Sequence, residues 1–298
     1  MRTGISIDVS AASRARLDEI VADRNNPQKH VWPRSRPQAK RSWKAKLTLW
    51  GSGMRLSVEL VPRSAAELVS DALIVKTMLP AANALNLPDL TRFQLRSWEA
   101  CQVTSRIVPA SIPHLRAIDF GTGEAEEVAE RLLQAGLREV LVVRGDPPRD
   151  LSRRTYPNSS EDVIHRLKHN FPELVVYAAY DPYRAGFREE LEAVKRKVDA
   201  GADGFFTQPI FDLNLLRVCA DILHSFSVFW GIAPVLGEKS RAYWEVTNKV
   251  VFPQEFEPTL AWNTAFARRA MDCVSEAGGN AYLMPIRIDL RKYLAELA

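Results

Sequence analysis

The 298-residue chain has only three cysteines, and it lacks the long apolar runs that membrane proteins need. Cys101, Cys219 and Cys273 show no C-x-x-C spacing, which argues against a disulfide framework and against a zinc site. No apolar stretch approaches the roughly 20 residues that a transmembrane helix requires. The N-terminus has Arg2 but no apolar core of a secretory signal. We therefore expect no metal site, no membrane association and a cytoplasmic location.

The sequence also lacks the short motifs of several common enzyme classes. No G-x-G-x-x-G follows an early predicted strand, which weakens a Rossmann fold. No G-x-S-x-G motif is present, and no cysteine lies beside a histidine at a predicted strand end, so there is no clear nucleophile. A set of two histidines and a carboxylate at metal-binding spacing is missing too. The candidate functional groups that remain are acidic, basic and amide side chains.

The composition, 46% hydrophobic and 26% charged, is typical of a soluble globular protein. The formal net charge is +4, and much of this excess lies in residues 30–46, where two tryptophans are interleaved among basic side chains. Such a stretch could bind nucleic acid. A solvated arm is the preferred interpretation because the stretch contains no base-reading module, and an arm that packs against a second subunit of a homo-oligomer is a further alternative. Nucleic acid is therefore not an expected partner.

Residues 51–53 form a Gly-Ser-Gly break, which divides the chain into a basic N-terminal extension, 1–53, and a domain, 54–298. In that domain, strand-like and helix-like segments alternate. The predicted strands are 55–61, 84–87, 115–120, 140–143, 174–180, 204–208, 228–235 and 281–288. The predicted helices are 12–23 in the extension and then 65–79, 95–107, 123–135, 161–170, 187–200, 213–226, 238–251 and 259–277. Eight alternating units predict an α/β fold, a closed (β/α)8 TIM barrel, with a doubly wound open sheet as the alternative.

One segment, E-V-L-V-V-R-G-D-P-P at 139–148, combines a buried strand with charged residues. The β-branched run stops at Arg144, Gly145 and Asp146, and the two prolines that follow cannot continue a strand ladder. A charged pair is thus placed at the carboxyl end of a strand, where α/β folds bind their ligands. The alternative is an Arg–Asp pair that only fixes a turn.

Polar residues also follow several other predicted strands. They are Glu59, Asp89, His114, Asp119, Tyr180, Asp181 and Gln208. Glu59 lies within the apolar segment L-S-V-E-L-V-P, where burial would raise the pKa of its carboxyl and suit it to act as a general acid. The alternative for Glu59 is the solvated face of an edge strand. His114 could equally be a structural histidine, and the basic run 195–197 could be an exposed helix face or a phosphate contact.

Five segments together resemble a known family. They are V-R-G-D-P-P (143–148), A-A-Y-D-P (178–182), K-R-K-V-D-A-G-A-D (195–203), T-Q-P-I-F-D (207–212) and G-I-A-P-V (231–235). In this order they resemble the catalytic domain of methylenetetrahydrofolate reductase, over residues 59 to about 235. The resemblance implies a (β/α)8 barrel that reduces methylenetetrahydrofolate to methyltetrahydrofolate in one-carbon metabolism and methionine biosynthesis. It implies NADH or NADPH as the reductant and, in most members, bound FAD.

The resemblance also assigns roles to individual residues. Glu59 takes the place of the general acid, and Asp146 would tune the cofactor and contact the pterin. Gln208 would contact the folate, with Asp89 and Glu99 as further acidic candidates near the pterin. The positions that match flavin contacts in the family are His114, Arg144, Gly145, Tyr180, Arg196 and Lys197.

The chain departs from the family pattern after its second predicted strand. The family has a T-x-G-A-G-G loop that helps to hold the flavin, whereas residues 86–93 here read N-L-P-D-L-T-R-F. Arg184 and Ala193 stand where the family often has histidine and asparagine. Two routes therefore stay open, reduction through FAD and direct hydride transfer from the nicotinamide to the folate. A non-redox barrel that binds folate or flavin and serves a methyltransferase is the alternative function.

Overall fold

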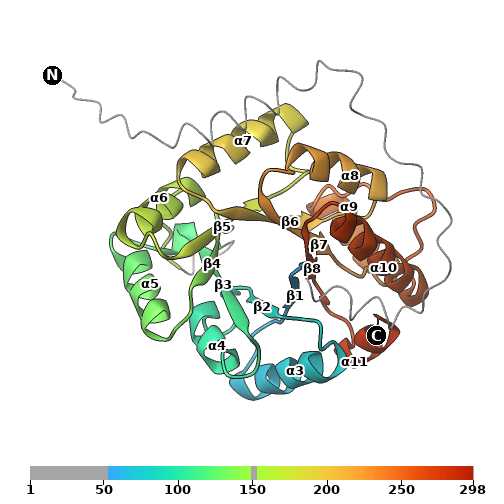
Figure 1. Cartoon of the computed structure of the whole chain (residues 1–298), viewed down its shortest axis with the longest axis horizontal. Helices are drawn as coiled ribbons and strands as arrows, with labels where there is room; N and C mark the ends of the chain where they lie inside the picture. The colour runs from blue at the N-terminus through green and yellow to red at the C-terminus, as the bar shows by residue number, and fades with distance from the viewer. Residues whose placement is uncertain (1–52, 149–152, 298) are drawn as a thin grey trace. The chain divides into compact units, whose positions relative to one another are not determined.

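Eight parallel strands form a closed barrel, and helices surround it (Figure 1). The computed structural model describes residues 53–148 and 153–297. Each strand pairs with the next along the chain, and the last pairs with the first. The strands are β1 (Leu56–Glu59), β2 (Ala84–Leu87), β3 (Ala110–Arg116), β4 (Glu139–Val143), β5 (Val175–Tyr180), β6 (Gly204–Pro209), β7 (Ser227–Ile232) and β8 (Asn280–Leu283). The predicted (β/α)8 barrel is confirmed.

The helices follow the strands in the order that the sequence predicted. They are α3 (Ala65–Met78), α4 (Ser97–Thr104), α5 (Glu124–Gln134), α6 (Ser160–Asn170), α7 (Phe187–Asp199), α8 (Leu213–Ile222), α9 (Glu238–Thr247), α10 (Leu260–Glu276) and α11 (Leu290–Leu297), with a 3-10 turn η3 at Ala117–Asp119. Side-chain caps fix several helix starts, as Ser64 does for α3 and Asp212 for α8. Helix α11 was not predicted, and β8 ends at Leu283, before the predicted end at residue 288.

The third strand was predicted at 115–120, and this prediction was wrong. Strand β3 covers Ala110–Arg116, so Pro113 and His114 lie inside it. The prediction treated Pro113 as a strand boundary because proline has no N–H to donate to a ladder. In the barrel, β3 pairs with β2 up to Pro113 and with β4 from His114 onward. The proline thus lies where the strand changes partners, a position that a reading of β-propensity does not reveal.

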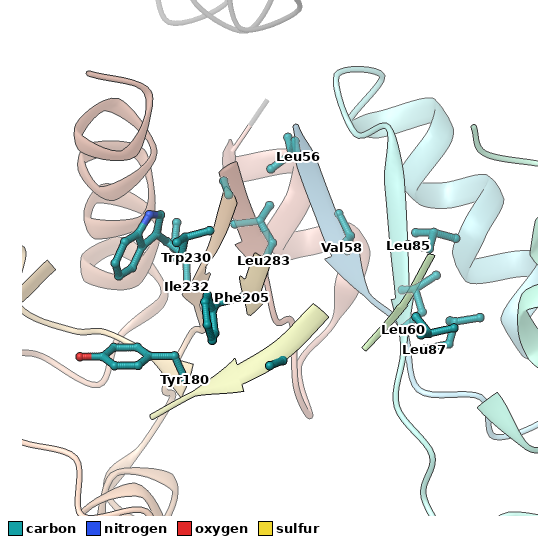
Figure 2. Close-up of a cluster of buried hydrophobic side chains, with 14 of the residues drawn as sticks. Leu56, Val58, Leu60, Leu85, Leu87, Tyr180, Phe205, Trp230, Ile232 and Leu283 are labelled. Atoms are coloured by element: carbon teal, nitrogen blue, oxygen red, sulfur yellow. The ribbon is translucent and has the colours of Figure 1, made fainter. Parts of the chain in front are cut away.

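The barrel has two hydrophobic layers, one on each side of its sheet. Outward-facing side chains pack against the helices, and Figure 2 shows Val58, Leu85 and Leu283 among them. Inside the barrel, the rings of Phe206 and Phe229 stack with centroids 4.2 Å apart. The other side chains of the inner cluster within the barrel include Ile112, Leu141, Tyr177 and Tyr282. Because these side chains fill the interior, a ligand can enter only at the mouth.

The amino ends of the strands are closed by a charged group that we call the floor cluster, Arg55, Glu139 and Tyr177. The Glu139 carboxylate accepts hydrogen bonds from Arg55 Nη1 and Nη2 at 2.6 and 2.9 Å and from Tyr177 Oη at 2.8 Å. The Arg55 guanidinium also lies 5.2 Å from the ring centroid of Phe229. The floor cluster therefore ties β1, β4 and β5 together at the end of the barrel opposite the mouth.

Tyr177→Phe is expected to lower the free energy of unfolding by about 1 kcal/mol, because it deletes the hydrogen bond to Glu139 and the weaker one accepted from Arg55, while the ring still fills the interior. Urea unfolding of the two proteins measures this difference. Catalytic turnover should stay unchanged, because the floor cluster lies away from the mouth. A Tyr177→Phe protein with wild-type stability would contradict the structural role given to the floor cluster.

The predicted extension, 1–53, and its helix, 12–23, lie outside the described residues except for Gly53, so the division into an extension and a domain stays a prediction. Within residues 53–148 and 153–297, no helix combines the length and the apolar character needed to cross a membrane.

Candidate active site

The carboxyl ends of all eight strands surround one mouth, because the strands are parallel and the barrel is closed. The polar side chains at these ends are candidates for ligand contacts. Among the described residues, two of the cavities around this end of the barrel have a volume of about 590 Å³ each. We name them the Glu59 cavity and the Arg144 cavity after one lining residue of each. The first lies near β1, β2, β7 and β8, and the second lies beside β4, α6 and α7.

Glu59 is the last residue of β1, and its side chain is buried within the barrel mouth. It is 8% exposed and accepts a hydrogen bond on Oε2 from the hydroxyl of Tyr282 on β8. Burial raises the pKa of the Glu59 carboxyl from 4.5 to about 7, and the Tyr282 hydrogen bond opposes this rise. Glu59 can therefore hold a proton near neutral pH, which is the property that a general acid requires.

The Glu59 cavity offers the carboxyl a ligand-sized space with apolar walls and a charged rim. Its walls include Pro88, Leu90, Pro234, Trp244 and Ile286. Three cationic side chains also line it, Arg92 from the β2–α4 loop, Lys239 from α9 and Arg287 from the segment after β8. This arrangement suits a flat apolar ring near the acid and an anionic group near the rim.

A chain of hydrogen bonds crosses the barrel interior beside Glu59. Ser57 Oγ donates to Asn86 Oδ1, and Asn86 Nδ2 lies 3.1 Å from His114 Nε2. Burial lowers the pKa of the His114 ring to about 3, so His114 is neutral at physiological pH. Asn86 is also the residue of β2 paired with Glu59. His114 thus faces the barrel interior, where it is a hydrogen-bonding group rather than a cation.

The Arg144 cavity brings together three residues that the resemblance assigned to cofactor binding, Arg144, Arg196 and Lys197. Lys197 is buried, and its Nζ donates to the carbonyl of Ala179 on β5 at 2.7 Å. Burial lowers the pKa of Lys197, although the carboxylate of Glu161 opposes the shift. Arg196 lies 3.9 Å from that same carboxylate. The guanidinium of Arg144 is exposed at the end of β4.

The R-G-D turn after β4 depends on its glycine. Gly145 has a φ of +84°, and a Cβ there would lie 3.1 Å from side-chain atoms of Arg116 and Ile118. Arg116 Nη2 donates to the carbonyl of Asp146 at 2.7 Å, and the side chain of Asp146 is exposed. Glycine is therefore required for the backbone, whereas the Asp146 carboxylate is free to face a ligand.

Asp89, Glu99 and Tyr180 have structural surroundings, and like His114, Gly145, Asp146 and Gln208 they line neither cavity. Asp89 is buried and pairs with Arg96, Glu99 accepts a hydrogen bond from the backbone N–H of Arg96 at the start of α4, and Tyr180 lies in the outer hydrophobic layer. Figure 2 shows Tyr180 among these outer side chains, and its Oη lies 3.7 Å from the sulfur of Cys219 on α8. Neither described cavity is lined by these three residues. Their ligand roles stay predictions without a geometric basis.

Gln208 is half-buried in β6, two residues after the interior Phe206. The β6–β7 register shifts between Phe206 and Pro209, and here Gly231 of β7 approaches the backbone closely. A Cβ on Gly231 would lie 2.7 Å from the carbonyl oxygen of Thr207. The glycine thus permits the irregularity that places Gln208 at the mouth.

Several residues of this site were not predicted from the sequence. Asn86 and Tyr282 face the interior from β2 and β8, and Arg92, Lys239 and Arg287 line the Glu59 cavity. Asn86 carried a signal, since it is the single polar residue of the strand A-L-N-L. Tyr282 gave none, because a tyrosine in an apolar strand is typical of a core residue.

Comparison with known proteins identifies a family. The methylenetetrahydrofolate reductase family model matches residues 91–268, which is more than half of the chain. The 5,10-methylenetetrahydrofolate reductase of Escherichia coli (strain K12) is 28% identical over 142 residues, 46% of this chain and 48% of that protein. Methylenetetrahydrofolate reductase 2 of Saccharomyces cerevisiae is 25% identical over 170 residues, 49% of this chain and 27% of that protein. The chain thus spans about half the length or less of these relatives.

Solved structures show the same fold in other enzymes. A 2,3-dimethylmalate lyase of the PEP mutase/isocitrate lyase superfamily has a TM-score of 0.51 at 11% identity, covering 84% of this chain and 81% of that chain. An oxaloacetate acetylhydrolase has a TM-score of 0.50 at 9% identity, covering 78% and 76%. At such identities the likeness concerns the barrel alone.

Glu59 and Tyr282 both lie outside the segment that the family model matches, so the case for them depends on the geometry of this barrel. The matched segment itself contains the R-G-D turn, the basic run of α7 and the end of β6. It is on this segment that the chain belongs to the methylenetetrahydrofolate reductase family.

Proposed function

We propose that this protein reduces methylenetetrahydrofolate to methyltetrahydrofolate, with NAD(P)H as the reductant and Glu59 as the general acid. The observation that carries the proposal is the buried Glu59 carboxyl, which has a pKa of about 7 and lines a cavity at the barrel mouth. The family membership supplies the reaction class, and the Glu59 cavity supplies a group with the required chemistry.

The reaction needs one proton and one hydride. Methylenetetrahydrofolate must open its five-membered ring, and the nitrogen that leaves the bridging carbon has to take up a proton. Protonated Glu59 donates that proton as the carbon–nitrogen bond breaks, which leaves an iminium on the folate. NAD(P)H, when bound, supplies the hydride that converts this iminium to the methyl group. Glu59 is left as a carboxylate and regains its proton from solvent.

The Glu59 cavity can orient the folate for this step. The apolar walls suit the pterin ring beside the acid, and Arg92, Lys239 and Arg287 suit the carboxylates of the glutamate tail. Gln208 and Asp146 do not line the Glu59 cavity, but they lie at the carboxyl ends of β6 and β4 and are proposed to contact the pterin from there. Positioning of both reactants in one mouth contributes to the rate because it replaces an encounter in solution.

The Arg144 cavity is proposed to take the phosphates of the dinucleotide. Its cationic side chains are Arg144, Arg184, Arg196 and Lys197, and the α6 start at Ser159 and Ser160 also lines it. Backbone N–H groups at a helix start and arginine guanidinium groups are both suited to phosphate oxygens. Three glutamates line the same cavity, so its charge is not uniform.

The residues after β2 do not fit the way in which the family holds FAD. The family uses glycine-rich backbone there, whereas this chain has Asp89 buried in an ion pair with Arg96. Tyr180, which matches a flavin-contact position, lies in the outer layer. We therefore propose direct hydride transfer from the nicotinamide to the folate, without an intermediate flavin.

The proposed function is tested with the purified protein, methylenetetrahydrofolate and either NADH or NADPH. The expected result is loss of the absorbance of the reduced nicotinamide together with formation of methyltetrahydrofolate, by a protein with no visible flavin spectrum. A non-redox binding barrel would bind the folate and leave the nicotinamide absorbance unchanged. An active yellow protein would retain the reductase and overturn direct transfer.

Arg144→Ala is expected to raise the KM for NAD(P)H about tenfold, with a smaller effect on kcat, because one guanidinium contact to a phosphate is lost. Arg138→Ala is a matched control, since Arg138 is an exposed arginine just before the other end of the same strand. Steady-state kinetics with the dinucleotide varied measure both. Equal KM values in the two variants would remove the Arg144 cavity from dinucleotide binding.

A further inference from the structure

The two oxygens of the Glu59 carboxyl have different surroundings. Oε2 accepts the hydrogen bond from Tyr282, and within the described residues this is the only hydrogen bond to the carboxyl. The same side chain lines the Glu59 cavity. One oxygen is therefore fixed to the barrel, which leaves Oε1 to interact with a ligand.

The ring of Tyr282 is held in place by the aromatic interior. It packs edge-on against Phe206, with centroids 5.1 Å apart and an interplanar angle of 87°, and Phe206 in turn stacks on Phe229. Tyr282 is paired with Ser57 in the β1–β8 register, two residues before Glu59. Its hydroxyl thus comes from one layer deeper in the barrel and reaches Glu59 from below, while the cavity lies toward the mouth.

Tyr282 acts on Glu59 only as a donor. It is 2% exposed, and burial raises the pKa of its hydroxyl well above 10, so it keeps its proton throughout the neutral range. A donor stabilises the carboxylate and also accommodates the neutral acid, whose Oε2 is then the carbonyl oxygen. The proton of the neutral acid is in that case on Oε1.

Other titratable groups also face this region. The side chains that line the Glu59 cavity and carry charge or a titratable hydroxyl are Arg92 from the β2–α4 loop, Lys239 and Tyr243 from α9, and Arg287 after β8. His114 on β3 is reached through Asn86 and is neutral. Among the described residues, none of them hydrogen-bonds to Glu59, so the direct contact of Tyr282 distinguishes it.

We propose that Tyr282 is the positioning residue for Glu59: its hydroxyl holds Oε2 so that Oε1 presents the transferable proton to the cavity. The proposal rests on the proposed function, in which Glu59 is the acid. Strand β8 would then contribute to proton donation through Tyr282, a role that the sequence of this apolar strand does not indicate.

The test compares Tyr282→Phe with Tyr177→Phe. Both changes delete one buried hydroxyl from the barrel interior and keep the ring, but Tyr177 belongs to the floor cluster. The first measurement needs no substrate: the Glu59 carboxyl is titrated by 13C NMR of labelled glutamate, and its signal is assigned by its loss in Glu59→Gln. The second is the pH dependence of kcat and kcat/KM for the reductase reaction.

We expect the wild-type carboxyl to titrate near the value of about 7. Tyr282→Phe should raise the midpoint by about one pH unit, since the carboxylate loses a hydrogen bond, and Tyr177→Phe should leave it unchanged. In kinetics, Tyr282→Phe should lower kcat about tenfold with KM within about twofold of wild type, and the alkaline limb of kcat/KM should move to higher pH.

An unchanged Glu59 midpoint in Tyr282→Phe would overturn the proposal. So would a fall in kcat that Tyr177→Phe shares, with no movement of the alkaline limb, because that result indicates a general loss of structure. If the wild-type protein shows no turnover, the proposed function fails, and the NMR titration still decides whether Tyr282 sets the proton affinity of Glu59.

Discussion

Glu59→Gln is expected to lower reductase turnover about a thousandfold, because the substitution removes the only proton donor proposed for ring opening and general acids typically contribute 10²- to 10⁴-fold. Glutamine has nearly the same shape and can still accept the hydrogen bond from Tyr282 through its amide oxygen. Folate binding should therefore remain close to wild type. Steady-state kinetics and equilibrium binding of methyltetrahydrofolate measure the two effects separately, and turnover within tenfold of wild type would remove Glu59 from the role.

The same substitution is expected to stabilise the fold at alkaline pH. Burial raises the pKa of Glu59 from 4.5 to about 7, so the folded state binds this proton more tightly than the unfolded chain does. Stability is therefore greatest below pH 4.5 as far as this group is concerned, and it falls as the pH rises from 4.5 to about 7. At pH 8 the buried carboxylate costs on the order of 3 kcal/mol, since each pKa unit corresponds to about 1.4 kcal/mol.

Urea unfolding at two pH values isolates this effect. Glu59→Gln should exceed the wild type in free energy of unfolding at pH 8, and the difference should largely disappear near pH 5, where most of the folded wild type carries the neutral acid. Equal stabilities at pH 8 would show that the carboxylate is not buried as the structure has it. Glutamate at position 59 is thus expected to give the active protein, and glutamine the more stable one.

Arg96→Ala is expected to destabilise the protein by about 3–5 kcal/mol, because it leaves the buried carboxylate of Asp89 without its partner. Arg96 Nε donates to Asp89 Oδ1 at 2.9 Å, Nη2 pairs with Oδ2, and the Asp89 side chain is 1% exposed. The guanidinium also lies 4.5 Å from the ring centroid of Trp98. The buried Asp89 carboxylate therefore requires the Arg96 guanidinium for folding, independently of any contact between Asp89 and a substrate.

Two controls separate the charge from the packing. Asp89→Asn combined with Arg96→Ala should recover part of the lost stability, since the unpaired charge is gone. Arg131→Ala breaks an exposed pair with Glu127, whose side chains are 64% and 69% exposed, and should cost less than about 1 kcal/mol. If the double variant keeps wild-type turnover, Asp89 is structural, and the predicted contact between Asp89 and the folate is wrong.

The fold was accessible from the sequence because the barrel repeats one local signal eight times. Each strand is a short apolar run with a helix after it, so β2 was placed at Ala84–Leu87 as observed. The exceptions have local causes. Pro113 was taken to exclude a strand that changes partners at that residue, and α11 (Leu290–Leu297) followed a strand predicted several residues too long.

The site was only partly accessible, because a strand-end position does not say which way a side chain faces. The apolar strand around Glu59 left both an interior and a solvated position open, and the structure buries the side chain. Tyr180 was predicted at the mouth, but it faces the helices. Asp89 forms a salt bridge with Arg96, and no sequence motif predicts this pair. Cavity-lining cations such as Lys239 come from the helices and loops that follow the strands, where a lysine is usually solvated.

Closure of the barrel has a consequence for how the protein matures. Glu59 and Tyr282 are 223 positions apart in the sequence, and the strands that carry them meet only when β8 docks beside β1. Contacts between such distant segments form late in folding because they require a long loop to close. Before that event Glu59 is hydrated and titrates as an ordinary glutamate, so a partly folded chain is an ineffective proton donor. The raised pKa of Glu59 is therefore expected only after β8 has docked beside β1 and the barrel has closed.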